Sequence, residues 1–160
     1  MTNVLIPTDF SLQSLDMAAA TIQHLPGKLN IVMFHAFDMP GSLIDAMHLG
    51  GFRNSNIITE ELRVKCCQLK AENANIASIR FQFMYGNTVT VFRQFAEANA
   101  IDLIMYPDKN FGSVLPESVD PHRMFLRSGV KVIRDLTPRA IASAHTILSE
   151  KRAPTLIPAH

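Results

Sequence analysis

The sequence predicts an α/β protein with a doubly wound, five-stranded parallel sheet, strand order 3-2-1-4-5, and helices on both faces. Five short apolar runs are separated by longer stretches in which apolar residues recur at helical spacing. The first two runs are apolar on both faces, which is typical of parallel strands that helices cover on each side. Strands and helices that alternate with right-handed crossovers build an open sheet of this kind.

The expected strands coincide with the five apolar runs, at residues 3–7, 29–37, 78–86, 102–106 and 130–135. The third run alternates between apolar and polar residues, so it is expected to be less buried than the first two. Pro26 and Gly27 separate the first helix from the second strand, because both residues interrupt a helix.

Apolar stripes and capping residues identify the expected helices. Ser11 is the expected N-cap of the first helix, and Asn87 or Thr88 is that of the third. The stripes are Leu12, Leu15, Ala19 and Ile22 in the first helix, Ile58, Leu62, Cys66 and Leu69 in the second, and Val89, Phe92 and Ala96 in the third. The second helix is expected near residues 57–75 and a fourth at residues 121–127.

The chain divides into one α/β domain at residues 1–136 and a C-terminal extension at residues 137–160. In the extension Pro138 can open a helix and Pro154 bars its continuation. The apolar residues of this helix, Ile141, Ala144, Ile147 and Leu148, share one face. A short amphipathic helix is marginal alone in water, so this face must dock. The sequence does not decide among three docking surfaces for this face: the chain's own domain, a dimer partner, and the crevice at the carboxyl ends of the strands.

Composition and charge limit the class of protein. Hydrophobic residues make up 48% of the chain and charged residues 18%, which is typical of a folded globular domain. Residues 1–120 carry a net charge of −4 and residues 121–160 one of +5. The basic residues are not interleaved with aromatic ones, so nucleic acid is not expected as a partner. No signal peptide and no apolar run of ~20 residues is recognisable, which favours a cytoplasmic protein without membrane contact.

A ligand crevice is expected at the carboxyl ends of the strands, where open parallel sheets bind ligands. The residues that this places together are Thr8, Asp9, His35, Ala36 and the segment 107–113. Asp9 can either organise the turn after the first strand or hold a ligand. His35 is expected to be a hydrogen-bonded histidine of the core or its rim.

The chain resembles the universal stress protein family over most of its length, from Asn3 to about Asp135. The resemblance rests on "NVLIPTDFSLQSLDMAAA", "LNIVMFHAFDMP", the Gly86 after the third strand, "DLIM" in the fourth, and the spacing of all five strands. It implies a five-stranded parallel sheet and frequent dimers, which the open edge formed by the fifth strand also favours. In one branch of the family it also implies ATP binding by an aspartate after the first strand, here Asp9. That branch carries Gly-x-x-Gly, nine residues and Gly-Ser or Gly-Thr after the fourth strand.

The present chain departs from that ATP-binding loop. The first glycine is replaced by Pro107, which has no N–H to donate to a phosphate, and the second by Asn110. The last glycine is replaced by Glu117 after a spacer of six residues. A carboxylate ~4 Å from a phosphate costs about 4 kcal/mol at an effective dielectric constant of ~20. The residues that would touch a nucleotide, if binding is retained, are Pro7, Thr8, Asp9, Ala36, Asn110, Gly112, Ser113 and Ser118.

No motif for catalysis, a metal or a cofactor is present. The sequence holds neither G-x-S-x-G nor G-x-x-x-x-G-K-[ST], and its histidines and cysteines lack metal-ligand spacing. Cys66 and Cys67 are adjacent, so one is expected to face the core and the other the surface. We therefore expect a non-enzymatic homodimer that binds a protein partner in the stress response without ATP. The alternative is a universal stress protein that binds adenosine or ATP through its altered loop, with weak ATPase activity.

Overall fold

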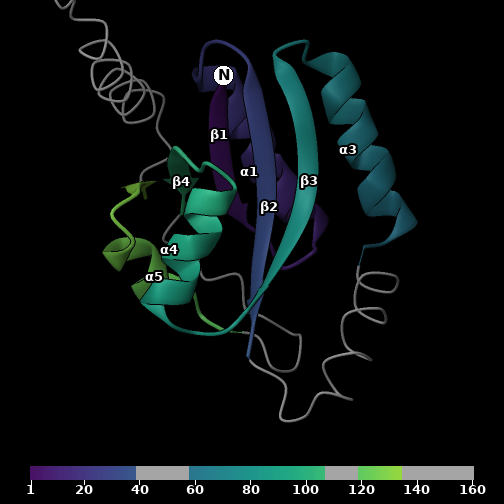
Figure 1. The fold of residues 1–160 in the computed structure, drawn as a ribbon. Coiled ribbons are helices and arrows are strands. Elements are labelled where there is room, and N and C mark those ends of the chain that lie inside the picture. Colours follow the sequence, from purple (N-terminus) through teal and green to yellow (C-terminus); the bar gives the residue numbers. More distant parts are fainter. Residues whose placement is uncertain (39–57, 107–118, 135–160) are drawn as a thin grey trace, which may run out of the picture.

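The computed structural model describes residues 1–38, 58–106 and 119–134 (Figure 1). The described elements are β1 (Thr2–Pro7), α1 (Leu12–His24), β2 (Leu29–Phe37), α3 (Glu60–Glu72), β3 (Ile76–Tyr85), α4 (Val89–Ala98), β4 (Leu103–Met105), α5 (His122–Arg127) and β5 (Lys131–Ile133). Each strand lies within or beside the run that predicted it. The expected helix of the C-terminal extension lies outside the described residues.

All the strand pairs in the sheet are parallel, and the strand order is β3-β2-β1-β4-β5. This confirms the predicted fold class and strand order. The central strand β1 is hydrogen-bonded on both sides, with Val4 opposite Ile31 of β2 and Leu103 of β4. As a result, the carboxyl ends of β1, β2 and β4 meet at one end of the sheet, where a ligand site was predicted.

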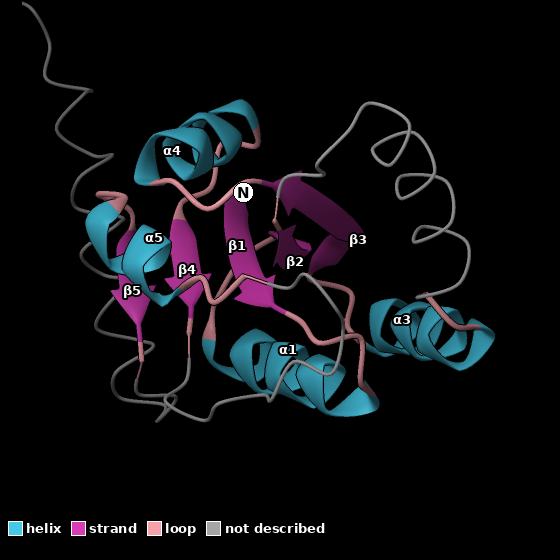
Figure 2. Ribbon diagram, turned by 90° about the horizontal axis from the view of Figure 1, so that it is seen from below, coloured by secondary structure: helices cyan, strands magenta, loops and turns pink. Residues whose placement is uncertain are grey.

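Helices cover both faces of the sheet (Figure 2). Helices α1 and α3 lie on one face, and α4 and α5 lie on the other. The side chains of successive residues in β1 pack on opposite faces of the sheet. Val4 and Ile6 pack in the cluster on the α1 side, whereas Leu5 packs with Phe34 in the cluster on the α4 side.

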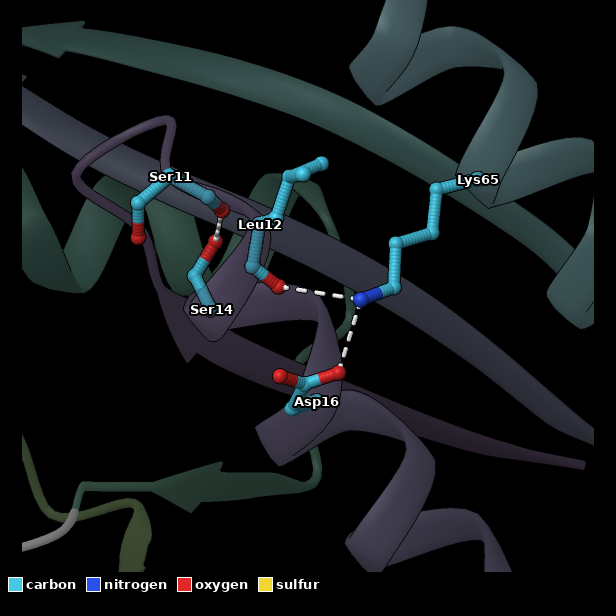
Figure 3. A network of polar contacts seen from close by, with 5 residues as sticks. All are labelled: Ser11, Leu12, Ser14, Asp16 and Lys65. Atoms are coloured by element: carbon cyan, nitrogen blue, oxygen red, sulfur yellow. Dashed lines mark hydrogen bonds and ion pairs between the residues drawn. The ribbon is translucent and has the colours of Figure 1, made fainter.

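Two helices differ in detail from their predicted stripes. In α3 the expected residues Leu62 and Leu69 are buried, but the helix begins only at Glu60, because the side chain of Thr59 caps it. In α1, Leu15 is buried, whereas Leu12 is 41% exposed, so its expected place in the core was wrong. The first turn of α1 lies beside α3. There Lys65 Nζ donates to the Leu12 carbonyl at 3.5 Å and contacts Asp16 Oδ1 at 2.7 Å (Figure 3).

Other expectations about local structure are confirmed. Thr88 is the N-cap of α4 and accepts a hydrogen bond from Val91 N. Strand β3 is less buried than β1 and β2. Cys66 is partly buried against the core and Cys67 is exposed. None of the described helices is long and apolar enough to cross a membrane.

Candidate functional site

The turn from β1 into α1 forms the floor of the predicted site, and its hydroxyl groups are bonded to one another. Thr8 N donates to Phe34 O of β2 at 2.8 Å, which ties the turn to the neighbouring strand. Ser14 Oγ donates to Ser11 O at 2.7 Å and lies 2.8 Å from Thr8 Oγ1 (Figure 3 shows the Ser11–Ser14 bond). Since Ser14 has only one hydroxyl proton, Thr8 must be the donor to Ser14. Thr8 Oγ1 also accepts from Phe10 N at 2.9 Å, so its proton and one of its two lone pairs are used within the turn.

Asp9, the residue that the family resemblance links to a nucleoside, holds the turn together. Its Oδ1 atom accepts a hydrogen bond from Ser11 N at 2.9 Å and a second, short one from the Ser11 hydroxyl. An aspartate that bonds the backbone N–H two residues later forms an Asx-turn. The sequence left two roles open for Asp9, to organise the turn or to hold a ligand. The contacts of Asp9 in the structure are those of a residue that organises the turn.

His35 is buried at the carboxyl end of β2, as expected for a hydrogen-bonded core histidine. Its Nδ1 atom lies 2.6 Å from Thr8 O, and because a carbonyl can only accept, Nδ1 carries the proton. The ring of Phe10 lies 5.0 Å from the His35 ring and stacks on Phe81 and Phe83 of β3. Phe10 reaches this position with φ = 66°, a left-handed conformation that is uncommon for a bulky residue.

The carboxyl end of β2 is bridged on both sides by the chain itself. Val119 N donates to Ala36 O at 2.9 Å, and Gly86 N donates to Phe37 O at 2.8 Å. The Ala36 side chain is 2% exposed. The segment that returns from the predicted nucleotide loop thus bonds to the strand end at which a ligand was expected.

The structure brings together four of the predicted nucleotide-contacting residues: Pro7, Thr8, Asp9 and Ala36. The other four, Asn110, Gly112, Ser113 and Ser118, lie outside the described residues, as do Pro107 and Glu117. On the β4 side, the Tyr106 ring contacts the rings of Phe125 and His122, and the Arg134 guanidinium lies 5.8 Å from its centroid. Among the described residues, aromatic rings and hydroxyl groups therefore lie at this end of the sheet beside the Asp9 carboxylate and the His35 imidazole.

Sequence reasoning missed two residues of this turn. Ser14 is fully buried, and its position in the first turn of α1 was the available signal, because a serine there can bond the carbonyl three residues earlier. The left-handed conformation of Phe10 has no signal in the sequence, since glycine or asparagine is the usual residue for it.

Two features limit the chemistry of the described residues: the raised pKa of one thiol and the lack of a metal-binding group. Burial, followed by the neighbouring Cys67, raises the pKa of the Cys66 thiol to about 11, so little of it is the reactive thiolate near neutral pH. Within the described ranges, no group of three or more His, Cys, Asp or Glu side chains is placed to hold a metal ion. What the turn can do is hold the ends of β1 and β2 in a fixed geometry.

Comparisons with known proteins show which solved structures have a similar fold. No family model and no curated protein matches the sequence. Among solved structures, hypothetical protein PH0823 is 18% identical and aligns with a TM-score of 0.53 over 83% of this chain and 94% of its own. The universal stress protein UspA from Lactobacillus plantarum is 16% identical, with a TM-score of 0.52 over 83% of this chain and 96% of its own. Likeness at this level of identity concerns the fold alone, and the chain has the fold of the universal stress proteins.

Proposed function

We propose that this protein is a non-enzymatic, universal stress protein-like regulator of the stress response that binds a protein partner and does not bind ATP. The observation that carries the proposal is the closed hydrogen bonding at the carboxyl ends of β1 and β2. Thr8, Asp9 and the Ala36 carbonyl, which a nucleotide would have to contact, are each bonded to another part of the chain. A ligand that displaced one of these bonds would leave its former partner unpaired, and an unpaired buried polar group costs ~1–3 kcal/mol.

The sequence of the loop after β4 supports the same proposal. Pro107 and Asn110 stand where backbone N–H groups of glycines would approach the phosphates, and Glu117 adds a negative charge. The opposite reading, a nucleotide-binding protein with an altered loop, would need other residues to supply these contacts.

The proposal includes a homodimer in the cytoplasm that forms through the free edge of β5. β5 is the last strand of the described sheet, so its outer backbone groups face no other described strand. An edge of this kind favours pairing with a second strand. The charged residues that flank it, Lys131 and Arg134, oppose pairing, so the dimer has to be tested on its own.

Thermal unfolding with ATP and magnesium tests the absence of nucleotide binding. A ligand at 100 times its Kd stabilises a protein by about 2.7 kcal/mol, which raises the melting temperature by several degrees in a domain of this size. We expect no shift at millimolar ATP. A second measurement is mass spectrometry of the supernatant after freshly purified protein has been denatured. We expect this supernatant to contain no adenine nucleotide. A saturable rise in melting temperature, or a stoichiometric nucleotide, would replace this proposal with the nucleotide-binding one.

A further inference from the structure

A cavity of about 500 Å³ lies between α4 and the turn from α5 into β5, at the amino ends of β4 and β5. Its volume falls in the range of small-molecule sites, ~300–1,000 Å³. Helices α4 and α5 pack side by side on this face of the sheet (Figure 2), and a hydrogen bond of 2.7 Å from Arg93 Nη2 to Arg127 O joins them. The cavity is at the opposite end of the sheet from Thr8 and Asp9, so the site described above does not include it.

Two opposite charges on the α4 wall of the cavity are not paired with each other. Arg93 and Glu97 both line the cavity and lie four residues apart in α4, so they are neighbours on one side of the helix. The Arg93 guanidinium bonds to the Arg127 carbonyl instead, and no ion pair joins the Glu97 carboxylate to a described residue. Because a guanidinium has five N–H donors, Arg93 keeps donors for a further partner.

The third charged residue of the cavity, Asp102, is already bonded within the fold. Its Oδ2 atom accepts a hydrogen bond from Asn3 N of β1 at 2.9 Å. The cavity therefore offers a ligand one positive group, Arg93, and one negative group, Glu97. A ligand with a single charge would pair with one of these groups and meet a like charge at the other, whereas a ligand with both charges can pair with both.

Much of the remaining lining is apolar. Ala96, Ala100, Ile101 and Val130 border the cavity, and three of them, Ala96, Ile101 and Val130, belong to or pack on the cluster on the α4 side. We infer that the cavity binds a free α-amino acid with an apolar side chain. Its carboxylate pairs with the planar guanidinium of Arg93 and its ammonium group with Glu97, while the side chain lies on the apolar wall. The inference goes beyond the proposed function and does not depend on ATP binding or on the dimer.

Isothermal titration calorimetry of the full-length protein with L-leucine tests the inference. We expect saturable binding of L-leucine, and binding weaker by roughly tenfold or more for two analogues that each lack one charge. Isoamylamine lacks the carboxylate and leaves Arg93 unpaired, and isocaproate lacks the ammonium group and leaves Glu97 unpaired. If L-leucine shows no saturable binding, the inference is wrong. Equal affinities for L-leucine and either analogue would show that the cavity does not recognise both charges, and would overturn it as well.

Substitutions of the two charged residues assign the binding to the cavity. Both side chains are exposed, so Arg93→Gln and Glu97→Gln are expected to fold and to weaken L-leucine binding by roughly tenfold or more. Each variant is also expected to lose one preference: Arg93→Gln that for L-leucine over isoamylamine, and Glu97→Gln that for L-leucine over isocaproate. The matched control Glu72→Gln, an exposed position at the end of α3 on the other face, is expected to bind L-leucine like the natural protein. Unchanged binding in both cavity variants would place the ligand elsewhere and overturn the inference.

Discussion

The two edges of the sheet differ in how much of the described chain supports them. At one edge β3 has ten residues, pairs with β2 along its length and has α3 packed beside it. At the other edge β5 has three residues and pairs with β4 at three positions. Among the described residues, the β3 edge therefore has longer strand pairing and a helix beside it, whereas the β5 edge has only three paired positions. The contact with a second copy that we propose falls on the β5 half.

Side-chain packing follows the same division. Phe81 and Phe83 of β3 stack with Phe10, and Phe83 also contacts Phe37, so aromatic rings join the β3 edge to β2 and to the turn after β1. At the β5 edge, Lys131 and Arg134 are exposed and Val132 is only partly buried. Aromatic contacts within the described chain thus hold the β3 half, and the β5 edge is where we propose that a second copy binds.

The largest expected effect comes from removing the anchor of α3 on the β3 half. Leu62 is fully buried in the α1-side core, so Leu62→Ala is expected to lower the free energy of unfolding by ~2–5 kcal/mol. Val64→Ala, at a position on the same helix that is 47% exposed, is the control and is expected to cost less than ~0.5 kcal/mol. Urea unfolding followed by circular dichroism measures both. Similar losses in the two variants would show that α3 contributes little to the β3 half.

The next prediction concerns the free edge of β5 and uses the direction of its backbone groups. Tyr106 N donates to Ile133 O, so the backbone of Ile133 faces β4. Because successive residues of a strand face opposite edges, the backbone of Val132 faces outwards and that of Lys131 faces β4. Val132→Pro is therefore expected to abolish the dimer with little effect on the monomer, since it removes only an outward donor.

Lys131→Pro is the matched control, because it removes a donor that faces β4 and is expected to destabilise the monomer itself. Light scattering gives the association state, and thermal unfolding gives the stability. If the natural protein is a monomer at tens of micromolar, the dimer proposal fails. If it is a dimer and Val132→Pro stays dimeric, the interface lies elsewhere and the β5 edge is not the site of association.

The strands and their order could be predicted because their signals are local and repeated. Apolar runs and the spacing of Phe92 and Ala96 in α4 are visible in the sequence, and their burial follows directly. The error at Leu12 arose because a stripe fixes which residues share a face but not how the helix turns towards the sheet. At the site, the bond from Ser11 N to Asp9 is local and was foreseeable. The contact of His35 with Thr8 O joins residues 27 positions apart and needs the β1–β2 register.

The smallest expected effect is a pH dependence of the free energy of unfolding, which arises from Cys66 in α3 on the β3 half. The pKa of this half-buried thiol is raised from 9.0 to about 11, mainly by burial. Between these pH values the unfolded chain loses the proton while the folded protein keeps it, so the unfolded state binds fewer protons and stability falls as the pH rises. The contribution is fully present below pH 9 and lost through pH 11. Cys66→Ala is expected to flatten the fall in urea midpoint over this range, and Cys67→Ala, at the exposed neighbour, to leave it unchanged. Equal slopes in the natural protein and Cys66→Ala would show that the thiol is not shielded by the α1-side core.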